Sequence, residues 1–144
     1  MSLFIEQNKS LMQKYFEQVW NRGDLVFIDE NLATGFVSHD PVLGQPSGRE
    51  GIKWVVTMFR NAIPDLHFSI EDMIAEGDKV VTRYLSYGTH QGELMGMSPT
   101  GKKLTASGIV IDRIDSSSKI VEHWAKRDDL GLLQQLGVIP KQGN

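Results

Sequence analysis

Segment 120–128 carries side chains that together could do acid/base chemistry. Its composition predicts a β-strand, in which every second side chain points to the same face. Glu122, Trp124 and Asp128 share one face if the strand stays regular to its end. Two carboxyl groups beside an indole are unusual in a packed core and suit the wall of a pocket. The pattern therefore predicts Asp128 as a catalytic residue and Glu122 and Trp124 as ligand contacts.

A carboxyl group in such a place can carry a proton during a reaction. An apolar pocket raises the pKa of an aspartate toward neutrality, which suits a general acid or base. General acid/base catalysis removes a proton from one atom and later delivers a proton to another, and one carboxyl group can serve both steps. The alternative role for Asp128 is to cap the final helix. Asp129 is the stronger candidate for that cap.

Two histidines are candidates for assisting the carboxyl group. His39 ends a short predicted strand just before Asp40, and His90 leads into a loop that could lie at the pocket mouth. Each could equally be an ordinary surface residue. We expect the other two histidines, His67 and His123, to be exposed.

Arg83 is the fourth candidate for a catalytic role. It lies within an apolar predicted strand, where an unpaired charge would be costly. It therefore needs a partner, and either Glu122 or Asp128 could provide one. Arg83 would then polarise a substrate oxygen or form a structural ion pair.

Several large apolar side chains could line a cavity for a flat ligand, although such residues are more often plain core. These ligand-binding candidates are Phe16, Trp20, Trp54, Met58, Phe59 and Met97.

Helical patterns come first in the chain, and strands follow. Apolar residues at helical spacing predict helices over 12–20 and 52–62, and a short helix is expected over 129–135. Strands are predicted over 36–39, 68–76, 80–90, 104–114 and 120–126. Helices followed by a meander of strands indicate an α+β fold, in which a curved antiparallel sheet covered by helices can enclose a cavity.

Composition excludes several classes of function. The 144 residues suit one domain, 1–144, with one core. Without cysteine the chain has no disulfide, thiolate nucleophile or cysteine metal site, and we expect neither metal nor cofactor. A net charge of −3 without basic clusters disfavours nucleic acid as a partner. With no apolar run long enough for a bilayer and no signal-peptide pattern at the start, we expect no membrane association and a cytoplasmic protein.

Three segments resemble the SnoaL-like polyketide cyclases of the NTF2-like superfamily. They are 77–90, 96–102 and 119–137. The last is the most specific, with Lys-Ile-Val-Glu-His-Trp, Asp128 four residues after Trp124, and a Gln-Leu-Gly ending. The resemblance implies a conical fold with a pocket between sheet and helices. It also implies ring closure by an intramolecular aldol step without metal or cofactor, with Asp128 as the acid/base. Some of these cyclases add a histidine on the neighbouring strand, and 104–114 contains none.

Three hypotheses of function follow. The leading one is a cofactor-independent cyclase or isomerase acting on a small, hydrophobic, polyketide-like carbonyl compound. The alternative is a protein of the same fold that binds a small hydrophobic ligand without chemistry. A protein-association domain is the third, and it would need an exposed apolar patch.

The predicted strand 104–114 also bears on assembly. Its stretch from Gly108 to Ile111 is apolar on both faces, whereas a sheet with one solvated face alternates apolar and polar residues. A second copy of the chain is the simplest cover for the outer face. We therefore expect a homodimer whose interface includes Val110.

Overall fold

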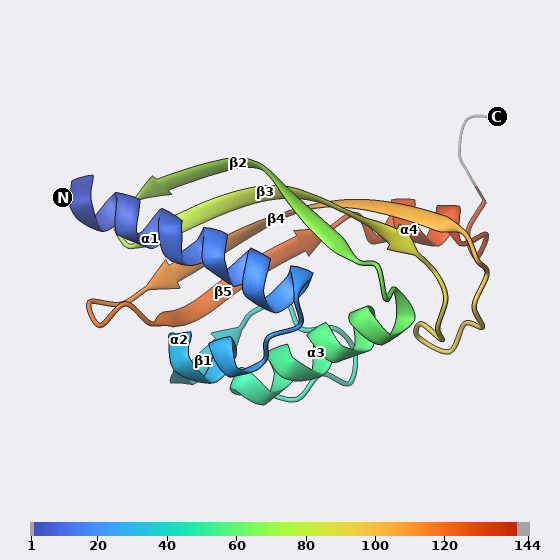
Figure 1. Cartoon of the computed structure of the whole chain (residues 1–144), viewed down its shortest axis with the longest axis horizontal. Helices are drawn as coiled ribbons and strands as arrows, with labels where there is room; N and C mark the ends of the chain where they lie inside the picture. Colours follow the sequence, from blue (N-terminus) through green and yellow to red (C-terminus); the bar gives the residue numbers. More distant parts are fainter. Residues whose placement is uncertain (1, 141–144) are drawn as a thin grey trace.

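A computed structural model describes residues 2–140 (Figure 1). The helices are α1 (Ser2–Tyr15), the π-helical η1 (Phe16–Asn21), α2 (Val26–Asn31), α3 (Gly48–Ala62) and α4 (Asp129–Gln135). The strands are β1 (Leu32–Ser38), β2 (His67–Glu76), β3 (Lys79–Thr89), β4 (Lys103–Ile114) and β5 (Ile120–Arg127). None of the helices within residues 2–140 combines the length and apolar character needed to cross a lipid bilayer.

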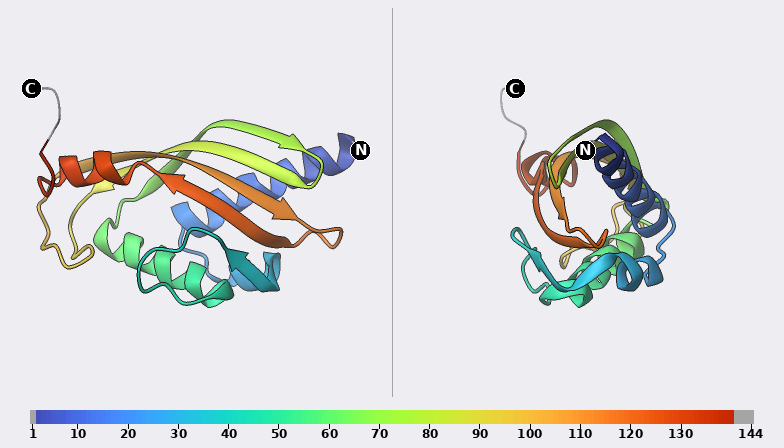
Figure 2. Two further views of the ribbon diagram at one scale, coloured as in Figure 1. Left: turned by 180° about the vertical axis from the view of Figure 1, so that it is seen from behind. Right: turned by 90° about the vertical axis from the view of Figure 1, so that its left-hand side faces the viewer.

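The five strands form one curved sheet in the order β1-β5-β4-β3-β2. Strands β2 to β5 form an antiparallel meander, and β1 joins the edge of β5 in parallel. The sheet bends around one side, which α1 and α3 close (Figure 2). We call the face of the sheet turned toward these helices the inner face, and the opposite one the outer face.

The N-terminal helices pack one stripe of apolar side chains against the inner face. Met12, Tyr15, Phe16 and Val19 are buried along α1 and η1. Gly23 follows with a positive φ of 72°, a conformation that glycine adopts without steric cost, so the chain reverses there. The Asp24 carboxylate then accepts a hydrogen bond at 3.1 Å from the amide of Val26, the first residue of α2.

Alternation along the strands separates the two faces of the sheet. In β3, Val80, Thr82, Tyr84 and Ser86 are buried on the inner face, while the residues between them are exposed or half-buried. The core therefore lies between the sheet and the helices, and its central part is where a cavity remains.

The predicted α+β fold with a curved sheet covered by helices is confirmed. One local expectation differs. Strand β1 begins at Leu32 rather than Phe36, because its start pairs with Ile120 of β5. Ser47 stands at the N-cap of α3, and its side chain makes no capping hydrogen bond.

Candidate active site

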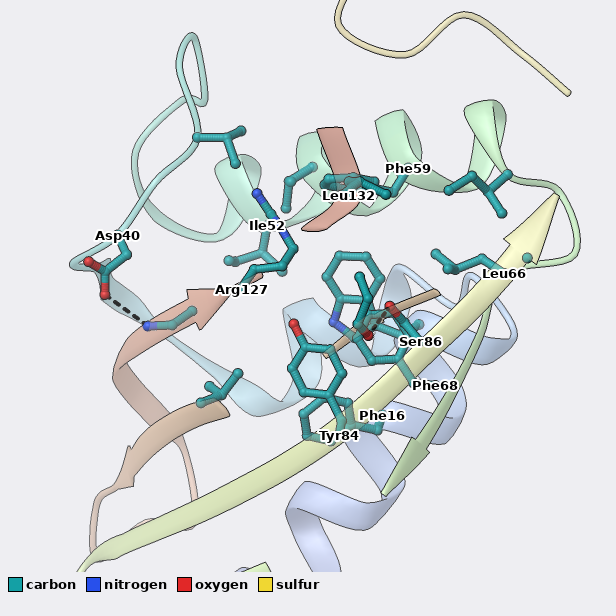
Figure 3. A pocket seen from close by; sticks show the side chains of 18 of the residues that line it. Phe16, Asp40, Ile52, Phe59, Leu66, Phe68, Tyr84, Ser86, Arg127 and Leu132 are labelled. Carbon is teal, nitrogen blue, oxygen red and sulfur yellow. Dashed lines mark hydrogen bonds between the residues drawn. The ribbon is translucent and has the colours of Figure 1, made fainter. Parts of the chain in front are cut away.

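A cavity of about 110 Å³ lies between the inner face of the sheet and the helices α1, η1 and α3 (Figure 3). Its walls are mainly apolar and aromatic, and include Phe16, Trp20, Phe59, Phe68, Leu104 and Leu132. A concave apolar pocket with a few polar groups is the usual form of a small-molecule site. The chemistry available to a ligand here depends on the few polar side chains that reach the cavity.

Strand β5 supplies two of these polar side chains from its inner face. His123, Ala125 and Arg127 line the cavity. The register of β5 with β4 fixes this orientation, because His123 lies opposite the buried Asp112. The expectation that His123 is exposed is therefore wrong: its side chain is only 13% exposed.

His123 connects a hydroxyl group on one side with a carboxyl group on the other. The Ser38 hydroxyl lies 2.9 Å from His123 Nε2, and both side chains line the cavity. On the far side of the ring, Asp112 Oδ1 lies 3.7 Å from Nδ1. That distance is too long for a hydrogen bond but places the carboxyl group as the nearest charge partner of the imidazole. The order is therefore hydroxyl, imidazole, carboxyl, from the cavity into the core.

Asp112 is a carboxyl group held almost without water. It is 1% exposed, and its Oδ2 atom has no hydrogen-bond partner. Burial raises the pKa of Asp112, and the neighbouring His123 imidazole offsets part of that rise. A buried carboxyl group beside a histidine is a frequent feature of catalytic sites, where it orients the ring and stabilises its charged form.

Tyr15 contributes a second proton donor near the same point. Its side chain lines the cavity. Burial, reinforced by the charge of the nearby Asp112, raises the pKa of Tyr15 above its ordinary value. The phenol therefore keeps its proton at physiological pH and can donate a hydrogen bond to a ligand oxygen.

Asp40 is the carboxyl group that lines the cavity, but its oxygens are occupied. Oδ2 accepts the Ala125 amide at 2.8 Å, and Oδ1 pairs with Lys126 Nζ at 2.7 Å. These two hydrogen bonds lower the pKa of Asp40. An aspartate engaged in this way is a weak base, so Asp40 fixes the strand end rather than moving protons.

Three of the predicted pocket-facing residues, Glu122, Trp124 and Asp128, lie away from the cavity. Glu122 and Trp124 point to the outer face of β5, because that strand turns its odd-numbered residues inward. Asp128 is exposed and accepts a hydrogen bond from the Gly131 amide at 2.9 Å. It is therefore the N-cap of α4, the position expected for Asp129.

His39 joins Glu122 and Trp124 in a cluster on the outer face. Its ring stacks on that of Trp124 with centroids 4.6 Å apart and an interplanar angle of 7°. His39 Nε2 donates to Glu122 Oε2 at 2.8 Å, and Arg113 Nε donates to Glu122 Oε1 at 2.6 Å. These two hydrogen bonds lower the pKa of Glu122. The structure thus brings together three of the predicted site residues, but on the side opposite the cavity.

His90 and Arg83 also lie outside the set that lines the cavity. His90 is fully buried in the loop after β3, with Nδ1 2.9 Å from the Thr100 hydroxyl and Nε2 unpartnered. Arg83 is exposed on the outer face, beside a shallow groove that Asp128 also borders. It forms no ion pair within residues 2–140, because water solvates its charge and a partner is unnecessary.

The predicted ligand contacts divide in the same way. Phe16, Trp20 and Phe59 line the cavity. Trp54 is 37% exposed on α3. Met58 and Met97 are half-buried against the core without reaching the cavity.

Val110 also lies on the opposite side from the one expected. It faces inward and lines the cavity, so it cannot lie in an interface formed by the outer face. Its neighbours Ile109 and Ile111 point outward instead.

The described residues offer no place for a metal built from side chains. Residues 2–140 contain no group of three or more His, Asp or Glu side chains arranged around a common point. The cavity groups His123, Ser38 and Tyr15 are those of proton transfer and hydrogen bonding.

The fold and this cavity define a class of protein. Residues 10–136 match the SnoaL-like polyketide cyclase family, and the chain belongs to that family. Among curated proteins it is similar to the aklanonic acid methyl ester cyclase DnrD of Streptomyces peucetius, with 32% identity over 75% of this chain and 72% of DnrD.

Solved structures agree with this assignment. TsrD from Streptomyces laurentii is 27% identical and superimposes with a TM-score of 0.82, covering 96% of this chain and 98% of TsrD. IdmH from Streptomyces antibioticus is 33% identical with a TM-score of 0.79, covering 92% of this chain and 99% of IdmH.

Proposed function

We propose that this chain is a cofactor-independent cyclase that closes a ring in a small, hydrophobic, polyketide-like carbonyl compound by an intramolecular aldol step. The observation that carries the proposal is the His123 imidazole at the wall of an apolar cavity, with Asp112 behind it. The similarity to DnrD supports the class of substrate.

His123 acts as the base in this mechanism. Nε2 faces the cavity, so it can take a proton from an activated carbon of the substrate, and the substrate's own carbonyl groups stabilise the resulting enolate. The imidazolium formed then protonates the alkoxide that the ring closure creates. The proton is returned, so the reaction is an isomerisation and needs no co-reactant.

Asp112 stabilises the charged imidazole during this step. A carboxylate 3.7 Å from Nδ1 attracts the positive charge that the ring gains when Nε2 takes the proton. Tyr15 donates a hydrogen bond to the oxygen that gains charge, since its phenol stays protonated. The aromatic walls fold the flexible chain so that its reacting carbons meet.

The test is ring closure of aklanonic acid and, separately, of its methyl ester, the compound in the name of DnrD. Chromatography follows each reaction, because each product has the same mass as its substrate. Wild-type protein treated with EDTA should convert at least one of the two compounds. His123→Gln should lose the activity, and His39→Gln, which changes the same residue type on the outer face, should keep it. Equal activity in the two variants would contradict the role of His123.

A ligand-binding function without chemistry is the second candidate. The observation that favours it is that Ser38 already occupies the hydrogen-bonding position at His123 Nε2. If this candidate holds, the ligand is recovered unchanged, and His123→Gln alters affinity without altering any rate.

We also propose that the protein is a homodimer formed through the outer face of the sheet. That face exposes the large apolar side chains of Ile74 and Ile109. Exposed apolar area of this kind on a sheet is a frequent site of association. A two-fold sheet-on-sheet contact would cover it with the same face of a second copy.

A further inference from the structure

One inner-face rung of the sheet brings two hydrogen-bond donors to either side of a glycine. Tyr84 of β3 lies opposite Gly108 of β4, and Gly108 lies opposite Arg127 of β5. A Cβ at Gly108 would collide with the hydroxyl and ring atoms of Tyr84. The absence of a side chain here lets the Tyr84 ring lie across β4 toward Arg127, and both side chains line the cavity.

Arg127 is the cationic side chain among those that line the cavity in residues 2–140. Its Nε donates to Asp129 Oδ1 at 2.7 Å, and its guanidinium carbon lies 5.0 Å from the centre of the Phe59 ring. The two Nη atoms make no hydrogen bond within the described residues. Asp129 is exposed, so water screens its charge and leaves the cavity side of the guanidinium to attract an anion.

Tyr84 directs a second donor toward the same place. Its hydroxyl points toward the Arg127 side chain (Figure 3) and has no hydrogen-bond partner within the described residues. Burial raises the pKa of Tyr84, while the charge of Arg127 opposes part of that rise. The hydroxyl therefore remains protonated and can donate to a ligand oxygen.

We propose that Arg127 and Tyr84 form a carboxylate-binding subsite, so that the substrate of this protein is a free acid with an apolar body. The fork of the guanidinium matches the two oxygens of a carboxylate, and an ester offers neither the charge nor the second acceptor in that geometry. This inference rests on the proposed function, because it names the substrate class for the same cavity.

The position of the subsite also sets the shape of the ligand. Arg127 lies four residues beyond His123 on the same face of β5, roughly 13 Å along an extended strand. The carboxylate is therefore held away from the carbon that reacts at His123. The acid group anchors the molecule while ring closure takes place at its other end.

A matched pair of probes, 2-naphthoic acid and methyl 2-naphthoate, tests the subsite by calorimetric titration. Wild-type protein should bind the acid at least tenfold more tightly than the ester. Arg127→Gln should abolish this preference. Lys126→Gln removes the same charge from the adjacent residue, whose side chain is 83% exposed, and should keep the preference. Tyr84→Phe should weaken binding of the acid a few-fold and leave the ester unchanged.

Equal wild-type affinity for acid and ester would overturn the subsite without any variant being needed. A preference that persists in Arg127→Gln would overturn it as well. These outcomes are separate from the proposed function, since His123→Gln should retain the acid preference while losing ring closure. If the wild-type protein closed the ring but bound acid and ester equally well, the subsite would be wrong and the proposed function would stand.

Discussion

The two faces of β5 carry similar residue types but use them in opposite ways. On the outer face, His39 and Arg113 both bond to Glu122, and the ring of Trp124 is stacked. On the inner face, His123 has one hydroxyl partner and a carboxyl group 3.7 Å away. Fully partnered polar groups hold a surface in place, and partly partnered groups beside a cavity remain available to a ligand. The extent to which polar groups have hydrogen-bond or ion-pair partners, rather than their residue type, distinguishes the candidate site from the outer face.

The largest expected effect that separates the two faces is the loss of ring closure in His123→Gln. Proton transfer by a positioned side chain contributes about 10²–10⁴-fold, so we expect a rate loss of that order. Glutamine keeps a hydrogen-bonding group near Ser38 and limits structural damage. The measurement is initial rate under saturating substrate, with thermal unfolding to show that the variant is folded. If His39→Gln lost as much activity, the division between the faces would fail.

Asp112→Asn should have the second largest effect, with a rate loss of about tenfold or more, equivalent to about 1.4 kcal/mol. Because burial raises the pKa of Asp112, wild-type activity should rise with pH as this carboxyl group ionises. The variant should lack that rise, and a pH–rate profile measures it. A variant that kept the wild-type profile would remove Asp112 from the mechanism.

The free energy of unfolding should also depend on the ionisation of Asp112. It should fall as pH rises, whereas the activity should rise. The folded-state pKa of Asp112 lies above its ordinary value of 3.8, so the folded protein retains this proton longer than the unfolded chain. The contribution to stability is therefore greatest below 3.8 and is lost as pH rises through the raised pKa. Denaturant unfolding at several pH values should show this slope in wild type and a flatter one in Asp112→Asn. Identical slopes would contradict the burial of an ionising carboxyl group.

Assembly provides a test of the outer face. Ile109 is 48% exposed there, so Ile109→Arg should place a charge in the proposed dimer contact and shift the protein toward monomer. Light scattering at micromolar concentration measures the mass. Lys126→Gln, which leaves the apolar residues intact, is the control. A wild-type monomer, or a dimer indifferent to the new charge, would end the dimer proposal.

The smallest effect expected is that of Asp128→Ala. The change removes the cap hydrogen bond to Gly131 and should lower the free energy of unfolding by about 1 kcal/mol. Ring closure should stay near the wild-type rate, because the side chain is exposed outside the cavity. Asp128→Asn keeps a capping oxygen and should recover the stability. A loss of activity in both variants would restore Asp128 as the proton carrier.

The sequence predicted the fold because helical spacing and strand alternation each report a local period. It could not assign the face of β5, because that depends on register with β4. The register shifts between Arg113 and Ile114, and a shift of one residue exchanges the two faces. Glu122 and Asp128 beside Trp124 looked like a pocket wall, but Glu122 belongs to an ion-pair cluster on the outer face and Asp128 caps α4. Asp112 was missed since nothing local distinguishes a buried aspartate from a solvated one.

Under the proposed mechanism, the residue types expected on 104–114 and 120–128 are exchanged between the two strands. The acid is on β4 and the histidine on β5. The signal that could have found this pair was the register of the β4–β5 hairpin, taken together with the charged residues of both strands.

The most direct test of the account follows the imidazole resonances of ¹⁵N-labelled protein during titration with 2-naphthoic acid. Assignments come from single His→Gln variants. The account predicts that the His123 resonances shift with saturation while those of His39 stay in place, because only His123 lines the cavity. Shifts confined to His39, with His123 unchanged, would show that ligands bind the outer face and would contradict the account.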